Sequence, residues 1–170
     1  LKPEGVATFE FPHLLNLISN NQFDTIYHEH YSYLSLSSVK TIFENNGLCV
    51  FKVDKLPTHG ESLRVFAQRL DTKNRLVESS VQGLINIEEK AGIKVMNFYE
   101  NFQVRANKVK NDFIHFLLKA NIEGKIVVGY GAAAKANTLM NFAGVRSDLL
   151  SYVVDKNPDK QDKFLPGSRI

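Results

Sequence analysis

The chain has 170 residues, of which 44% are hydrophobic and 23% charged, and its net charge is +3. This is a globular composition, with enough apolar residues for one core or two small ones. The positive excess is too small to indicate a nucleic-acid partner, and the apolar runs are too short for a membrane span. The single Cys49 excludes a disulfide within the chain, so we expect a cytoplasmic protein.

The first region, residues 1–70, is predicted to mix strands and helices. Apolar runs indicate three strands, at residues 6–11, 48–53 and 62–68. The last two are expected to pair antiparallel, joined by the loop at residues 57–60. Two helices are expected, one near residues 14–19 and one over residues 39–44, which Ser37 or Ser38 caps and Gly47 ends.

The second region, residues 71–121, is predicted to be a helical connector. Apolar residues recur every seven positions in two series, Val95, Phe102, Val109, Phe116 and Tyr99, Ala106, Phe113, Ala120. This spacing predicts one apolar stripe along a long helix, and such a stripe serves packing rather than ligand binding. Gly92 is expected to interrupt the N-terminal part of that helix.

The third region, residues 122–170, is predicted to begin a parallel strand–helix–strand unit. The expected elements are a strand at 126–128, a tight turn at 129–131, a helix at 132–142 and a strand at 151–155. This order opens a right-handed nucleotide-binding unit, so the predicted fold class is α/β. The chain starts on Leu1 and stops on a turn, which leads us to expect a piece of a longer enzyme.

The run Gly129-Tyr130-Gly131-Ala132-Ala133-Ala134 fits the G-x-G-x-x-G/A pattern, with a strand before it and a helix after it. The glycines permit a sharp turn and close approach to a phosphate, and amide groups at the helix start would face the anion. Lys135 would add positive charge, and Asp155 lies where an acid often accepts a ribose hydroxyl. A nicotinamide dinucleotide, S-adenosylmethionine or a sugar nucleotide would suit the turn, as would no ligand. Residues 155–158 can equally be a polar loop.

Residues 27–33, Tyr-His-Glu-His-Tyr-Ser-Tyr, combine two imidazoles, a carboxylate and three phenols. An extended chain puts His28 and His30 on one face, whereas a helical turn gathers Tyr27, His30 and Tyr31. Either imidazole can take a proton near neutral pH, and a phenol and an acid can orient it or stabilise an oxyanion. One alternative is a structural hydrogen-bonded cluster. Another is a metal pair, for which the candidate third ligands are His13, His59 and His115.

A second polar group is the run His59-Gly60-Glu61-Ser62-Leu63-Arg64, at the entrance of a predicted strand. Ser62 and Arg64 suit contacts to an anion or a carbonyl group. The alternative is a charged turn with Arg64 pointing outward.

Taken together, these stretches resemble the S-adenosylmethionine-dependent C-methyltransferases of deoxysugar biosynthesis. The resemblance is carried, in collinear order, by residues 23–36, 59–65, 129–139 and 155–167. That family methylates C3 of a nucleotide-linked 4-keto-deoxysugar, typically a thymidine diphosphate (dTDP) sugar. Its members have a small zinc-binding domain, a methyltransferase domain that holds the cofactor, and a C-terminal α/β domain that helps to hold the sugar nucleotide.

The resemblance implies how the three regions belong to that architecture. Residues 1–70 would end the methyltransferase domain and its Rossmann-like sheet, and residues 122–170 would begin a Rossmann-like domain that binds the sugar nucleotide. The site for S-adenosylmethionine, and any zinc, would lie mostly upstream of Leu1, so no metal is expected in this segment and the chain alone should be inactive. The family usually has glycine where this chain has Glu61 and Ala136.

The resemblance also assigns roles to residues. The family's tyrosine, glutamate and second histidine fall on Tyr27, Glu29 and His30. His30 would remove the proton beside the ketone, and the other two would position or stabilise the enolate that attacks the methyl group. The expected substrate-binding residues are His28, Tyr31, Tyr33, Ser62, Arg64, Gly129, Tyr130, Gly131, Lys135, Asn137 and Asp155. The alternative function is a non-catalytic module that binds NAD or a sugar nucleotide.

Overall fold

The structure is a computed structural model that describes residues 1–72 and 74–170, without the side chain of His59. It divides into two compact units whose segments alternate along the chain. The first unit comprises residues 1–22 and 31–100, and the second comprises residues 23–30 and 101–170. Both contain helices and strands, so the fold is mixed α and β. The division into three regions at residues 70 and 121 stays a prediction.

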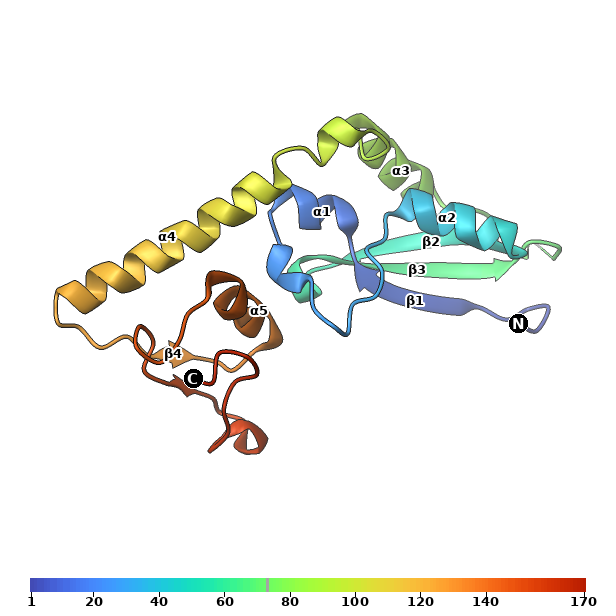
Figure 1. The fold of residues 1–170 in the computed structure, drawn as a ribbon. Helices are drawn as coiled ribbons and strands as arrows, with labels where there is room; N and C mark the ends of the chain where they lie inside the picture. The colour runs from blue at the N-terminus through green and yellow to red at the C-terminus, as the bar shows by residue number, and fades with distance from the viewer. Residues whose placement is uncertain (73) are drawn as a thin grey trace. The chain divides into compact units, whose positions relative to one another are not determined.

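The first unit is built on a three-stranded antiparallel sheet (Figure 1). Its strands are β1 (Ala7–Pro12), β2 (Leu48–Leu56) and β3 (Ser62–Arg69), in the order β1-β3-β2. The central strand β3 pairs with both neighbours, and the β2–β3 ladder shifts register between Val50 and Lys52. The strands and the antiparallel pair lie where the sequence predicts them.

Helices α2 (Leu36–Asn45) and α3 (Ser79–Ala91) pack on β2 and on each other. Between these helices and the sheet lies an apolar core formed by residues of α2, β2, β3 and α3. They are Leu36, Val39, Val50, Val53, Leu63, Val65, Val81, Leu84 and Ile85. The short helix α1 (Leu14–Ser19) has the predicted bounds.

The cap of α2 differs from the prediction. Ser35 is the N-cap, and its hydroxyl accepts a hydrogen bond from the Ser38 N–H at 3.0 Å. The predicted cap at Ser37 or Ser38 is therefore wrong. The helix starts earlier because a buried carboxylate, Glu88 of α3, accepts hydrogen bonds from the N–H groups of Leu36 and Ser37.

The predicted long helix is divided in the structure. α3 ends at Ala91, with Gly92, whose φ is 83°, as its C-cap. A connection with the 3-10 turn η3 (Met96–Phe98) then precedes α4 (Phe102–Ile122). Val95 and Tyr99 therefore lie outside α4, and the prediction of one stripe from residue 95 is wrong there. The stripe also fails at Phe116, which is 58% exposed, whereas the buried residues of α4 are Ala106, Leu117 and Ala120.

The second unit contains α4, α5 (Ala134–Ala143) and two short parallel strands, β4 (Gly129–Tyr130) and β5 (Val153–Val154). Its core is formed by Leu117, Met140, Val145, Leu150 and Ile170. The order strand, helix, parallel strand agrees with the sequence prediction.

The boundaries of this parallel unit differ from the prediction. Residues 126–128 form no strand, and α5 begins two residues later than expected. Gly129 leaves room for its ladder partner, because a Cβ there would lie 2.9 Å from Val153 Cγ2. Gly131, with φ 97°, then turns the chain out of the strand.

Candidate functional site

The predicted reactive segment begins in the second unit, where residues 23–30 form a series of tight turns. A 3-10 turn, η1 (Phe23–Thr25), opens it. The Tyr27 N–H then donates to the Thr25 carbonyl at 3.1 Å, and the His30 N–H donates to the Tyr27 carbonyl at 3.0 Å. The chain is not extended: this last turn brings Tyr27 and His30 together, as the helical alternative predicts, whereas Tyr31, the third residue of that alternative, belongs to the first unit.

The His30 imidazole is held in one orientation. Its Nδ1 lies 2.7 Å from the carbonyl oxygen of Thr25, which is fully buried. A carbonyl can only accept, so Nδ1 carries the hydrogen and Nε2 of the neutral ring keeps its lone pair. The Tyr27 ring packs against the imidazole with centroids 4.3 Å apart. The result is a half-buried imidazole whose Nε2 can accept a proton.

The neighbouring charged residues differ from His30 in environment. The side chains of His28 and Glu29 are 87% and 69% exposed, and their closest charged atoms are 3.9 Å apart. Tyr31, which belongs to the first unit, is 93% exposed, and Tyr33 is half-buried. The structure thus separates the two imidazoles, which spacing alone leaves equivalent: only His30 has a fixed ring.

Ser62 and Arg64 lie on β3 in the first unit, and both have partners within the fold. Ser62 is buried and its hydroxyl donates to the Thr58 carbonyl at 3.2 Å. The Arg64 guanidinium pairs with the Glu10 carboxylate of β1 at 2.9 Å. Glu61, before them, has φ 77°, a conformation that favours glycine. For Ser62 or Arg64 to contact a substrate, its bond to Thr58 or to Glu10 would have to break.

The glycine turn of the second unit is closed by Asp155, which follows β5. Its carboxylate accepts hydrogen bonds from the N–H groups of Asn157 at 2.8 Å and Ala132 at 2.6 Å, and these bonds lower the pKa of Asp155. The Ala132 amide, expected to face a phosphate, is therefore engaged by the chain's own carboxylate. Lys160 lies 3.6 Å from the same carboxylate.

The other predicted residues of this turn differ in exposure. Tyr130 is 84% exposed, whereas Gly129 and Gly131 are half-buried. Lys135 and Asn137 are half-buried on the first turns of α5. The structure thus brings the glycine turn and Asp155 together, with Lys135 and Asn137 on the helix that follows.

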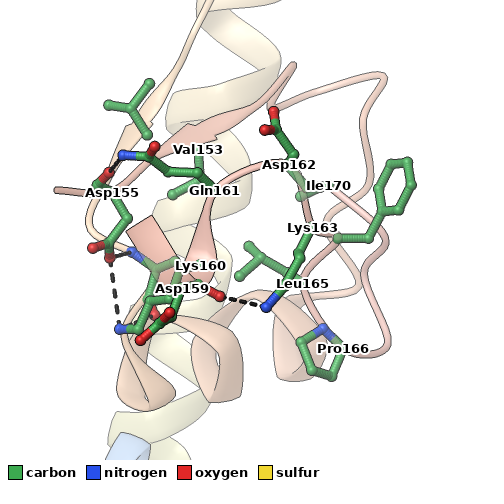
Figure 2. Close-up of a pocket in the computed structure, with 13 residues that line it drawn as sticks. Val153, Asp155, Asp159, Lys160, Gln161, Asp162, Lys163, Leu165, Pro166 and Ile170 are labelled. Carbon is green, nitrogen blue, oxygen red and sulfur yellow. Dashed lines mark hydrogen bonds and ion pairs between the residues drawn. The ribbon is translucent and has the colours of Figure 1, made fainter. Parts of the chain in front are cut away.

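An open pocket of about 490 Å³ lies beside β5 and the loop that follows it (Figure 2). Val153, Leu165 and Ile170 give it an apolar part. Its polar lining includes Lys160, Lys163 and Gln161, and Gln161 donates to the Asp155 carbonyl at 3.0 Å. Ligands of open parallel sheets bind outside the carboxyl ends of the strands, which is where this pocket lies.

Comparisons with known proteins identify the family. Residues 57–170 match the family described as the C-methyltransferase C-terminal domain. The chain belongs to this family. Over all 170 residues it is 38% identical to C-methyltransferase NovU of Streptomyces niveus, and it spans 40% of that protein's length. The resemblance predicted from the sequence is thereby confirmed.

The family match includes the glycine turn and the pocket beside β5, whereas residues 23–30 lie upstream of it, within the range aligned with NovU. Within the described residues, no three His, Cys, Asp or Glu side chains form a group that could hold a metal ion. The described part of the chain also has no helix long and apolar enough to cross a membrane.

Two groups that fix local geometry were not predicted from the sequence: Thr25 beside His30 in the second unit, and Glu88 in the first unit. Thr25 acts through its backbone carbonyl, so its side chain gives no signal in the sequence. Glu88 has a recognisable signal, because it continues the apolar spacing of Val81, Leu84 and Ile85 along α3. A carboxylate on the buried face of a helix indicates a buried hydrogen-bonding partner.

Proposed function

We propose that this chain is the C-terminal part of an S-adenosylmethionine-dependent C-methyltransferase that methylates C3 of a nucleotide-linked 4-keto-deoxysugar. The observation that carries the proposal is the His30 imidazole, whose Nδ1 donates to the Thr25 carbonyl and whose Nε2 remains a base. Membership of the C-methyltransferase C-terminal domain family and the similarity to NovU support it.

His30 is proposed as the general base. A hydrogen on C3 is acidic because the electron pair left behind is delocalised onto the oxygen of the C4 ketone. Nε2 takes this proton, and the imidazole becomes a cation that the Thr25 carbonyl stabilises through Nδ1–H. The neutral imidazole, with its lone pair on Nε2, is the form that can act as the base.

Tyr27 and Glu29 are proposed to position or stabilise the enolate. Tyr27 is the better supported of the two, since its ring already packs on His30. Glu29 is exposed, so it would contribute through the electrostatic effect of its negative charge on the site. When bound, S-adenosylmethionine would supply an electrophilic methyl group, and we propose that residues outside this chain bind most of that cofactor. The enolate carbon would accept this methyl group, and S-adenosylhomocysteine would leave with the electrons of the broken carbon–sulfur bond.

The nucleotide part of the substrate, most simply a dTDP group, is proposed to bind the second unit, which we take as a partial Rossmann-like domain. The pocket beside β5 supports this, because Lys160 and Lys163 in its lining carry ammonium groups that can bind a diphosphate. The carboxylates of Asp155, Asp159 and Asp162 also line the pocket, so the lysines would have to exchange their present partners for the diphosphate. Within this unit the proposed substrate-binding residues are His28, Gly129, Tyr130, Gly131, Lys135, Asn137 and Asp155. Tyr31, Tyr33, Ser62 and Arg64 belong to the first unit, and their contacts to the substrate are a separate proposal.

The test is His30→Ala in the intact enzyme, with His28→Ala as the matched control. The substrate probe is a dTDP-linked 4-keto-6-deoxyhexose. Exchange of its C3 hydrogen with deuterium oxide, in the absence of S-adenosylmethionine, measures deprotonation alone. We expect His30→Ala to slow exchange and methyl transfer by about 10²–10⁴ and the control to change them much less.

Three outcomes would contradict the proposal or part of it. Exchange at the wild-type rate in His30→Ala would remove the role of this histidine, and a larger loss in His28→Ala would transfer it to His28. Tight binding of NAD without binding of thymidine diphosphate would instead favour a dehydrogenase-like binding module.

A further inference from the structure

Helix α5 contacts the segment that carries His30. The helix begins directly after the glycine turn, and Phe142 lies in its last turn. The Phe142 ring meets the Phe23 ring of η1, with centroids 5.4 Å apart and planes inclined by 59°. From α4, the Lys110 ammonium lies 5.6 Å from the centroid of Phe142. These groups all belong to the second unit, so the contact lies within one compact body.

From Phe23 the connection to the imidazole is short and made by the backbone. Phe23 begins η1, and its carbonyl accepts a hydrogen bond from the Ile26 N–H at 3.0 Å. Thr25 ends η1, and its buried carbonyl accepts from the Tyr27 N–H and from His30 Nδ1. The orientation of the imidazole therefore depends on where η1 holds the Thr25 carbonyl.

We propose that Phe142 is a positioning residue for His30. Its ring holds Phe23, and with it η1 and the Thr25 carbonyl that orients the imidazole. Phe142 has no part in the chemistry, since its action passes through Thr25. This inference rests on the proposed function, because it assumes that His30 is the base.

Helix α5 connects the glycine turn with the segment that carries His30. Its N-terminal end follows the glycine turn, where the nucleotide is proposed to bind, and its C-terminal end carries Phe142. The helix has ten residues, so these ends are about 15 Å apart along one rigid rod. The base and the nucleotide-binding turn are thus parts of the same body, and a bound nucleotide would be presented to a base already oriented.

The experiment compares Phe142→Ala with Phe142→Tyr, which keeps the ring, in the intact enzyme. Phe116→Ala is the matched control, because Phe116 of α4 is 58% exposed and outside the proposed site. The main readout is again exchange of the C3 hydrogen of the dTDP-linked 4-keto-6-deoxyhexose in deuterium oxide. Heteronuclear NMR of the imidazole nitrogens reports whether His30 keeps its hydrogen on Nδ1.

We expect Phe142→Ala to lower the maximal exchange rate by about 10-fold to 100-fold, the effect of a misplaced catalytic group, with a much smaller change in KM. The NMR signals of His30 should lose the fixed Nδ1–H tautomer. Phe142→Tyr and the control Phe116→Ala should both keep the wild-type exchange rate and the Nδ1–H tautomer of His30. Phe142→Leu, which keeps apolar bulk without a ring, replaces the alanine variant if that variant fails to fold, and should also slow exchange.

The inference can fail separately from the proposed function. If His30→Ala abolishes exchange while Phe142→Ala and Phe142→Leu exchange at the wild-type rate, Phe142 is not a positioning residue and His30 remains the base. If His30→Ala exchanges normally, the proposed function itself fails. An equal loss in Phe142→Ala and in the exposed control would show a general loss of structure and would also overturn the inference.

Discussion

Glu88 of α3 is a carboxylate with no exposed surface, and four donors surround it. His13 Nε2 lies at 2.7 Å and the Leu36 N–H at 2.6 Å from Oε1. The Ser37 N–H at 2.8 Å and the Ser37 hydroxyl at 2.6 Å donate to Oε2. Burial of the carboxyl group acts to raise its pKa, but the hydrogen bonds from His13, Ser37 and Leu36 outweigh burial, and the pKa is lowered. These bonds fix the start of α2, which is also where the segment after Tyr33 enters the helix.

The substitution Glu88→Gln tests this network, because the amide keeps the shape of the side chain. Its NH₂ group cannot accept, so whichever oxygen it replaces, one backbone N–H of Leu36 or Ser37 loses its acceptor. The second donor on that side can adapt, since the Ser37 hydroxyl can rotate and His13 can change tautomer. A hydrogen bond to a charged group contributes roughly 1.5–3 kcal/mol, and an unsatisfied buried donor costs about 1–3 kcal/mol. These two figures overlap because they describe the loss of the same hydrogen bond, so we expect a loss of about 2–4 kcal/mol in unfolding free energy.

The assay is urea unfolding followed by circular dichroism, together with hydrogen exchange at the Leu36 and Ser37 amides. Glu89→Gln is the matched control, because Glu89 is the next residue of α3 and its side chain is 49% exposed beside Lys94. The control should change the unfolding free energy by less than about 0.5 kcal/mol. Unchanged stability and unchanged protection of both amides in Glu88→Gln would refute the reasoning.

Two further predictions concern pH and the second core. The lowered pKa of Glu88 stabilises the fold above the unfolded-state carboxyl pKa of about 4.3, and this stability is lost as pH falls through the folded value. As the pH is lowered below that value, Glu88→Gln should therefore lose less unfolding free energy than the wild type, measured by urea unfolding. An equal loss in the two proteins would contradict this prediction. Leu117→Ala should cost about 2–5 kcal/mol because Leu117 is fully buried, whereas Leu118→Ala, 45% exposed, should cost much less in the same assay. Similar costs for the two would count against the packing of this core.

The elements that the sequence predicts correctly are those with a strong local pattern. Helix α1, the antiparallel pair β2–β3 and the parallel unit around α5 follow from runs of apolar residues and the glycines between them. The seven-residue series in the second region misleads, because periodicity continues through residues 95–101, where a left-handed Asn101 and a 3-10 turn interrupt the helix. A pattern of apolar residues does not record such interruptions.

Which groups meet was decided by the tertiary structure. Sequence reasoning placed two imidazoles in one segment and, by family resemblance, selected His30, but the bond to the Thr25 carbonyl depends on a turn that residue types do not fix. Asp155 was expected to face a ribose, yet it accepts from the Ala132 amide, 23 residues away. His13 and Glu88 meet across 75 residues. Local periodicity sets secondary structure because backbone bonds within a helix are local, whereas a polar group takes whichever partner the folded chain brings within about 3 Å.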